Sequence, residues 1–388
     1  MSALREAGDT RAWTHEPERS RLSLTGQAEG AIPGIINLSN MHREYVDTAP
    51  DERQTCLRNQ AAGLMSSSVP SSLAEAQPGL RPVIRSSTER GVIKLQAFGA
   101  DSLVELAYRP LCENLEIGLA YDGEFNLLRL DSATLEQWGI TFDEALDIAI
   151  DNLRLVSSQP WLPLQNGVFV SQFNDYYDAS RLLLPDVLYR QPIAGAPVVM
   201  APNRTALLLT GDRNEAGLKT LLAAAEGALD QARALPPLML RWSGTAWEKF
   251  TPEALAGKLH QLRLRELAGD YHDQKTLIDE IHDQENVDIF VAQHTVLESE
   301  DGQQRSICVW SEGVHSLLPD TDYVALFRHE TQQTACVPRS VLHEQLGDFL
   351  KPTDYLPIRH EVTAFPDAAK FEAMLSTYGA LPGRSETS

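Results

Sequence analysis

Residues 166–234 read NGVFVSQFNDYYDASRLLLPDVLYRQPIAGAPVVMAPNRTALLLTGDRNEAGLKTLLAAAEGALDQARA, and this stretch decides the fold. It holds two short apolar runs, at 197–201 and 205–210, with Pro-Asn-Arg between them. Two apolar runs that are separated by a few turn-forming residues are typical of a β-hairpin. The stretch therefore predicts two antiparallel strands at its centre.

A helix and a second hairpin are predicted to follow. Asp212 or Asn214 can cap the helix through a side-chain oxygen. The apolar stripe of the helix consists of Leu218, Leu221, Leu222, Ala225 and Leu229. Prolines at 236–237 end the helix, because proline lacks the N–H and clashes with the preceding turn. Apolar runs at 238–242 and 246–250 predict the second hairpin, so the order of elements indicates an α+β fold.

Three segments of the chain resemble the YtpQ-like family of uncharacterised bacterial proteins. These segments are Leu38–Cys56 (LSNMHREYVDTAPDERQTC), Tyr177–Leu184 (YDASRLLL) and Val198–Gly211 (VVMAPNRTALLLTG). The resemblance covers roughly residues 30–250. It implies a cytosolic bacterial α+β protein, and it supplies no activity, because the function of the family is unknown.

The composition predicts two domains with mixed sheets and packed helices. A chain of 388 residues, 43% hydrophobic and 22% charged, is typical of a soluble globular protein. A helix start at 251–253 and a more acidic composition beyond it place the boundary near 251, between an α+β domain at 1–250 and a smaller acidic α+β domain at 251–388. The serine- and proline-rich segment 66–79 is predicted to be a linker or long loop. The run Val83–Leu95 predicts a strand.

Charge and cysteine usage exclude several classes of protein. A formal charge of −21 disfavours nucleic-acid binding, because an acidic surface repels phosphates. The acidic surface is better explained by solubility than by docking of a basic partner or mimicry of DNA. No apolar run of about 18 residues predicts a transmembrane helix, and the N-terminus does not resemble a secretory signal. Four widely spaced cysteines without a CxxC pair indicate reduced thiols in the cytoplasm.

Motifs for metals and cofactors are not found. Glycine-rich phosphate loops and the GxSxG motif are absent, so no cofactor is predicted. Three His-Glu pairs begin at His329, His343 and His360. A zinc-protease motif needs a second histidine four positions after the first. Those positions hold Gln333, Gly347 and Ala364. Eight of the ten histidines lie between His260 and His360, where polar surface residues are a better explanation than a metal site.

Tyr177, Asp178, Ser180 and Arg204 form the first candidate site. One interpretation is a small polar pocket beside the hairpin turn, in which Arg204 binds a carboxylate or phosphate through its planar guanidinium. The other is structural: Asp178 or Ser180 caps a local turn, and Arg204 pairs with Asp178 to fix the loop. We favour the structural interpretation, because no histidine or cysteine lies nearby to form a nucleophile–base pair.

Trp310 and His315 form the second candidate site, in an apolar segment that runs to Pro319. If Trp310, Leu317 and Leu318 are exposed, they form an anchor for a protein partner. If they are buried, they belong to the core. Tryptophan is usually largely buried, so the core interpretation is favoured.

The sequence therefore predicts a cytoplasmic bacterial protein that acts through protein–protein contacts, as an adaptor, a regulator or an immunity-type protein. The alternative is an enzyme, such as a hydrolase, with a polar pocket around Asp178 and Arg204. We expect a protein partner, and neither a nucleic acid nor a membrane.

Overall fold

The fold of the chain in the computed structural model is α+β, as the sequence predicts. The structure describes residues 1–25, 35–65, 69–99, 105–124, 126–171, 173, 175–231, 233–298 and 302–379. The chain divides into two compact units. The first unit comprises Met1–Ser86 and Gly99–Phe250, and the second comprises Ser87–Phe98 and Thr251–Ser388.

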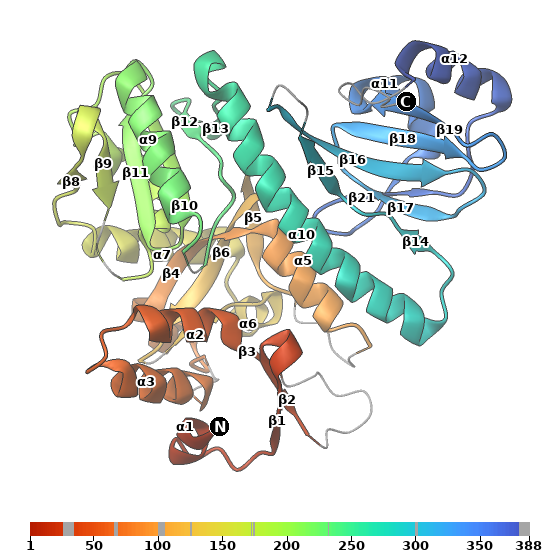
Figure 1. The fold of residues 1–388 in the computed structure, drawn as a ribbon. Coiled ribbons are helices and arrows are strands. Elements are labelled where there is room, and N and C mark those ends of the chain that lie inside the picture. Colours follow the sequence, from red (N-terminus) through yellow and green to blue (C-terminus); the bar gives the residue numbers. More distant parts are fainter. Residues whose placement is uncertain are drawn as a thin grey trace. The chain divides into compact units, whose positions relative to one another are not determined.

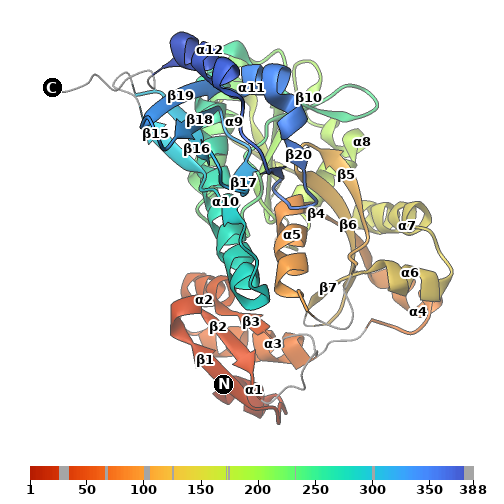
Figure 2. The ribbon, with the colours of Figure 1, turned by 90° about the vertical axis from the view of Figure 1, so that its right-hand side faces the viewer.

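The N-terminal part of the first unit is a small sheet with three helices (Figure 2). Its antiparallel strands are β1 (Trp13–Glu16), β2 (Arg21–Leu24) and β3 (Ile35–Asn37). Its helices are α1 (Ser2–Glu6), α2 (Leu38–Asp47) and α3 (Arg53–Met65). Leu4, Leu22, Ile36 and Ala61 form a small core between these elements.

A second sheet of the first unit is ordered β4-β6-β5, with β7 also paired to β6. The strands are β4 (Leu80–Ser86), β5 (Tyr108–Cys112), β6 (Leu115–Asp122) and β7 (Leu127–Arg129). The helices are α4 (Leu73–Ala76), α6 (Ser132–Trp138) and α7 (Phe142–Leu155). Thr141 and Glu144 form a reciprocal capping box at the start of α7, which fixes where this helix begins.

The stretch that decides the fold forms the centre of a six-stranded sheet, ordered β13-β12-β10-β11-β9-β8. Its strands are β8 (Leu162–Pro163), β9 (Phe169–Ser171), β10 (Pro197–Asn203), β11 (Ala206–Gly211), β12 (Leu240–Trp242) and β13 (Trp247–Lys249). The helices are α8 (Pro185–Leu188) and α9 (Glu215–Ala228). The Asn214 side chain caps α9 by accepting the Gly217 N–H at 3.0 Å. Both predicted hairpins and the helix between them are confirmed.

The second unit contains the helix α10 (Ala256–Glu285) and two four-stranded sheets (Figure 1). One sheet consists of β15 (Thr295–Glu298), β16 (Gln304–Ser311), β18 (Tyr323–Arg328) and β19 (Gln333–Pro338). The other consists of β14 (Phe290–Val291), β17 (Ser316–Pro319), β21 (Arg359–Val362) and β20 (Lys351–Pro352). The helices α11 (Arg339–Leu346) and α12 (Ala368–Tyr378) pack on the first of these sheets.

Two predicted segments differ from the structure. The predicted strand Val83–Leu95 is wrong beyond Ser86, where the helix α5 (Ser87–Gln96) begins. Glu89 in the first turn and Lys94 in the last turn suit the two ends of the helix dipole, and this favours the helix. The predicted linker 66–79 includes α4 and a 3₁₀ turn at Gln77–Gly79, while residues 66–68 lie outside the described residues.

The close approach of α5 to the segment around Leu356 gives a test of packing in the second unit. A Cβ atom on Gly91 would lie 2.4 Å from the Leu356 carbonyl oxygen, which is backbone and cannot move cheaply. We expect Gly91→Ala to lower the free energy of unfolding by about 1–3 kcal/mol, the usual cost of overpacking. Gly269→Ala in α10, where a Cβ meets nothing within 4 Å, is the control and should raise stability. Chemical denaturation measures the free energy of unfolding of both variants. Equal effects of the two substitutions would contradict the close packing inferred at Gly91.

Candidate functional site

Three of the four residues of the first candidate site are buried, and Arg204 is partly exposed. Tyr177 is 4% exposed, Asp178 0% and Ser180 2%. They lie at the start of a short 3₁₀ turn, η4 (Ala179–Leu183), between β9 and α8. A ligand could reach these side chains only if the loop opened.

Asp178 accepts several hydrogen bonds from its own loop. Its Oδ1 atom accepts a short hydrogen bond from the Ser171 hydroxyl and a 3.0 Å bond from the Phe173 N–H. Its side chain does not cap η4, in contrast to the predicted role. Burial raises the pKa of the Asp178 carboxyl, and the hydrogen bonds and a nearby arginine oppose that shift.

The arginine that pairs with Asp178 is Arg181, at 3.5 Å, and not Arg204 as predicted. Arg181 has no exposed side-chain surface, and it donates to both oxygens of Asp175 and to the Ser157 hydroxyl at 3.0 Å. Its guanidinium also lies 3.6 Å from the centre of the Phe173 ring. The Arg204 turn meets this loop through the main chain, because the Arg204 carbonyl accepts the Ala179 N–H at 3.3 Å.

Tyr177 extends this polar network to the sheet of β4 and β6. Burial raises the pKa of the Tyr177 phenol well above its usual range, and the carboxylate of Asp122 adds to the shift. Arg81 lies 5.9 Å from the centre of the Tyr177 ring and 3.9 Å from the Asp122 carboxylate. The network thus ties the loop at 171–181 to the sheet, which is a structural role.

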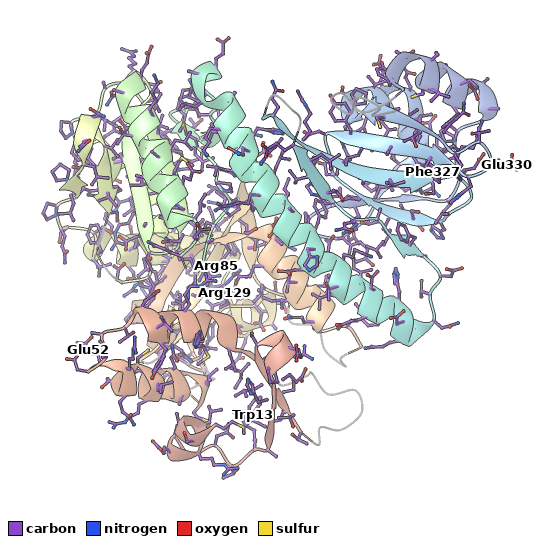
Figure 3. The ribbon with its side chains drawn as sticks, viewed as in Figure 1. Trp13, Glu52, Arg85, Arg129, Phe327 and Glu330 are labelled. Atoms are coloured by element: carbon purple, nitrogen blue, oxygen red, sulfur yellow. The ribbon has the colours of Figure 1, made fainter. Side chains whose placement is uncertain are left out.

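A second group of charges lies on the β4–β6–β7 sheet, where Figure 3 labels Arg85 and Arg129. Arg85 is paired directly opposite Glu116 in the register of β4 and β6. Arg129 reaches Glu116 from β7 at 3.8 Å, and its guanidinium lies over Gly118, where a Cβ would be 2.7 Å from Nη2. The sequence analysis missed this group, because its residues come from three separate strands.

Trp310 and His315 belong to the second unit, whereas the first candidate site belongs to the first unit. Trp310 is 0% exposed and packs edge-on against Phe349 and Phe365, so its predicted burial is confirmed. His315 lies half-exposed, with Nε2 2.7 Å from the Glu361 carboxylate. Trp310 is therefore part of the core and does not anchor a partner at the surface.

A buried arginine also organises the second unit. Arg359 is fully buried, and its acceptors among the described residues are all neutral: the Gln274 side-chain oxygen and the carbonyls of Ala292, Leu317 and Tyr271, at 2.6–3.2 Å. His294 stacks on the Tyr271 ring at 5.1 Å, and burial lowers the pKa of His294 to about 4. The Tyr271 hydroxyl also fixes the loop before β18, because it accepts the Asp320 N–H at 2.9 Å. These contacts of Arg359 and Tyr271 therefore have a structural role inside the second unit.

A cavity that can admit a ligand lies in the N-terminal part of the first unit. It has a volume of about 550 Å³. Its lining consists of Met1, Ala3, Leu4, His15, Pro17, Ser20, Leu22, Ile36, Leu38, Met41, His42, Tyr45, Leu57, Gln60, Ala61 and Leu64. We name this space the N-terminal cavity. None of these lining residues is an aspartate, glutamate, lysine or arginine.

Two helices supply half of the lining through the same spacing. From α2 come Leu38, Met41, His42 and Tyr45, and from α3 come Leu57, Gln60, Ala61 and Leu64. Both sets follow the pattern i, i+3, i+4, i+7, which places four side chains on one face of a helix. This repeated spacing is the signal in the sequence by which the N-terminal cavity could have been found.

Metal ligation and membrane spanning have no support in the described ranges. In the part of the chain that the structure describes, His, Cys, Asp and Glu side chains form no group of three or more that could hold a metal ion. Every helix within those same ranges is too short or too polar to cross a lipid bilayer.

No family model, no curated protein and no solved structure matches the chain. The resemblance to the YtpQ-like family therefore stays a prediction.

Proposed function

We propose that the protein binds a small, largely apolar molecule in the N-terminal cavity. The observation that carries this proposal is a space of about 550 Å³ with a mainly apolar lining. Ligand sites in proteins are typically concave, about 300–1,000 Å³ in volume, and lined by apolar side chains with a few polar groups. The N-terminal cavity has each of these properties.

The packing around the N-terminal cavity also favours an occupant. Its floor includes Leu4, Leu22, Ile36 and Ala61, which form the small core of this region. Side chains that face an empty apolar space lose the dispersion contacts they would make in a filled core. A bound apolar molecule restores those contacts, so binding should stabilise the helices α2 and α3 as well.

Ligand binding has better support than the two functions that we expected from the sequence. For the protein-contact role, Trp310 supplies no surface anchor, because it is buried, as the favoured interpretation predicted. The hydrolase alternative depended on Asp178 and Arg204, and Asp178 is buried and paired with Arg181. The N-terminal cavity depends on neither of these residues.

Filling the N-terminal cavity tests the proposal. Ala61 is buried at its wall, so Ala61→Trp places an indole where the ligand would lie. We expect the wild-type protein to bind one equivalent of a neutral apolar fluorophore, N-phenylnaphthylamine, and the variant to bind it at least about tenfold more weakly. Fluorescence titration measures both affinities.

Ala62→Trp is the matched control, because Ala62 is the next residue of α3 and does not line the cavity. It should bind the fluorophore with an affinity within about twofold of wild type. Circular dichroism of both variants establishes that α3 is still folded. Equal binding by wild type and a folded Ala61→Trp variant would refute the proposed function.

A further inference from the structure

Gln60 is the polar side chain of the N-terminal cavity whose orientation is fixed. Its Nε2 atom lies 3.2 Å from the Met41 carbonyl oxygen and 3.3 Å from a Glu44 carboxylate oxygen. Both partners can only accept a hydrogen bond, so the nitrogen must face them and donate both of its hydrogens. The remaining polar atom of the amide, Oε1, is an acceptor.

Glu44 is itself held in place. Its Oε1 atom lies 2.5 Å from the Arg233 guanidinium, and its Oε2 atom accepts from Gln60. The guanidinium of Arg233 lies 5.1 Å from the centre of the Tyr176 ring. A carboxylate with an arginine partner keeps its position. Glu44 therefore positions the Gln60 amide, and Arg233 offsets the negative charge of Glu44.

A second arginine, Arg53, lies beside the lining residue Tyr45. Arg53 lies 5.3 Å from the centre of the Tyr45 ring, and it donates to the carbonyls of Val46 and Thr48 at 2.9 and 3.1 Å. Its guanidinium is thus directed to the end of α2. The other polar side chains of the lining, those of His15, Ser20, His42 and Tyr45, also carry hydrogen-bonding groups.

We propose that the N-terminal cavity selects a neutral amphiphile whose polar end is a hydrogen-bond donor, such as a long-chain alcohol or primary amide, and that Gln60 recognises this donor through Oε1. This proposal rests on the proposed ligand-binding function. The apolar lining holds the chain of the amphiphile, and Oε1 accepts from its polar end. An ionised carboxylate is disfavoured, because it has no hydrogen to donate to Oε1 and loses its hydration in an apolar cavity.

The test compares three ligands with the same chain at pH 8: dodecanol, dodecyl methyl ether and dodecanoate. Each displaces N-phenylnaphthylamine from the wild-type protein in a competition titration. The ether keeps the chain and the oxygen but lacks the donor, so we expect it to bind about three- to tenfold more weakly than the alcohol. Dodecanoate, ionised at this pH, should bind at least about tenfold more weakly than the alcohol.

Variants test whether Gln60 causes the preference for the alcohol over the ether. In Gln60→Leu the ratio of alcohol to ether affinity should fall to about one. Glu44→Ala should lower the same ratio, because the amide is then free to turn. Gln54→Leu, on α3 but outside the lining, is the control and should keep the wild-type ratio.

The possible outcomes separate the two proposals. If the wild-type protein binds the fluorophore but binds the ether as tightly as the alcohol, the selection proposal is overturned and the ligand-binding function stands. The same holds if Gln60→Leu keeps the wild-type ratio. If the wild-type protein does not bind the fluorophore, both proposals fail.

Discussion

Replacing Arg181 with methionine should lower the free energy of unfolding by about 3–5 kcal/mol, the usual cost of removing one partner from a buried ion pair. Arg181 is fully buried and is the cation beside both Asp175 and Asp178. Methionine fills much of the same space but leaves the Asp178 carboxylate in the protein interior without a positive neighbour. Denaturant unfolding measures the loss.

A second substitution and the pH dependence separate charge from packing. Asp178→Asn combined with Arg181→Met should cost less than the sum of the two single changes, because the unpaired charge is also removed. Without Arg181, the pKa of Asp178 rises further above its unfolded value. Folding then favours the protonated carboxyl, so stability is greatest at low pH and falls as the pH rises through the folded pKa. The deficit of Arg181→Met should therefore be smaller at pH 5 than at pH 8.

The matched control is Arg190→Met, which removes an exposed arginine whose ion pair with Asp186 lies in solvent. Such surface pairs contribute about 0–1 kcal/mol. Equal losses for Arg181→Met and Arg190→Met, or a loss for Arg181→Met that is the same at pH 5 and pH 8, would contradict the proposed role of Arg181.

Replacing Arg359 with methionine should lower the stability of the second unit by about 3 kcal/mol. The substitution removes a donor from the Gln274 side-chain oxygen and from three carbonyls in a buried site, although the Leu317 carbonyl keeps the Ala292 N–H at 3.0 Å. Each buried acceptor that loses its partner costs about 1–3 kcal/mol. Relief from burying an arginine without a carboxylate offsets part of that sum, since burial already lowers the pKa of Arg359 to about 10.

A thermal melt gives the simplest measurement for Arg359. A loss of about 3 kcal/mol corresponds to a fall of about 6–12 °C in the melting temperature of a unit of this size. Arg305→Met removes an exposed arginine of β16 in the same unit and should change stability by less than about 0.5 kcal/mol. If Arg359→Met melted at the temperature of Arg305→Met, the supporting role of Arg359 would be wrong.

The hairpins and α9 could be predicted because their signals are local. The turn at 202–204 separates two apolar runs, and Asn214 caps the helix with its own side chain. The helix α5 was missed because Val92, Ile93 and Leu95 suit a strand as well as a helix, and the contact of Gly91 with Leu356 comes from a distant segment. Local sequence patterns thus predict those helices and strands whose boundaries are set by neighbouring residues.

The polar network around Asp178 was predicted less well, because the contacts of its side chains depend on tertiary structure. Asp178 was identified as important, but the sequence could not show that Arg181, three residues later, would pair with it instead of Arg204. The two helical faces around Met41 and Ala61 are visible as patterns. Whether two such faces pack tightly or leave a cavity depends on how the helices approach one another, and no local pattern encodes that distance.

Ligand binding in the N-terminal cavity can be measured directly by NMR of the six methionine methyl groups during titration with N-phenylnaphthylamine. Met1 and Met41 line the N-terminal cavity, whereas Met200, Met239 and Met374 are buried elsewhere. The aromatic rings of the ligand shift the resonances of methyl groups that they touch. We predict saturable shifts of the Met1 and Met41 signals at one equivalent, with the signals of Met200, Met239 and Met374 unchanged. Saturable shifts of those three signals, with Met41 unchanged, would contradict ligand binding in the N-terminal cavity.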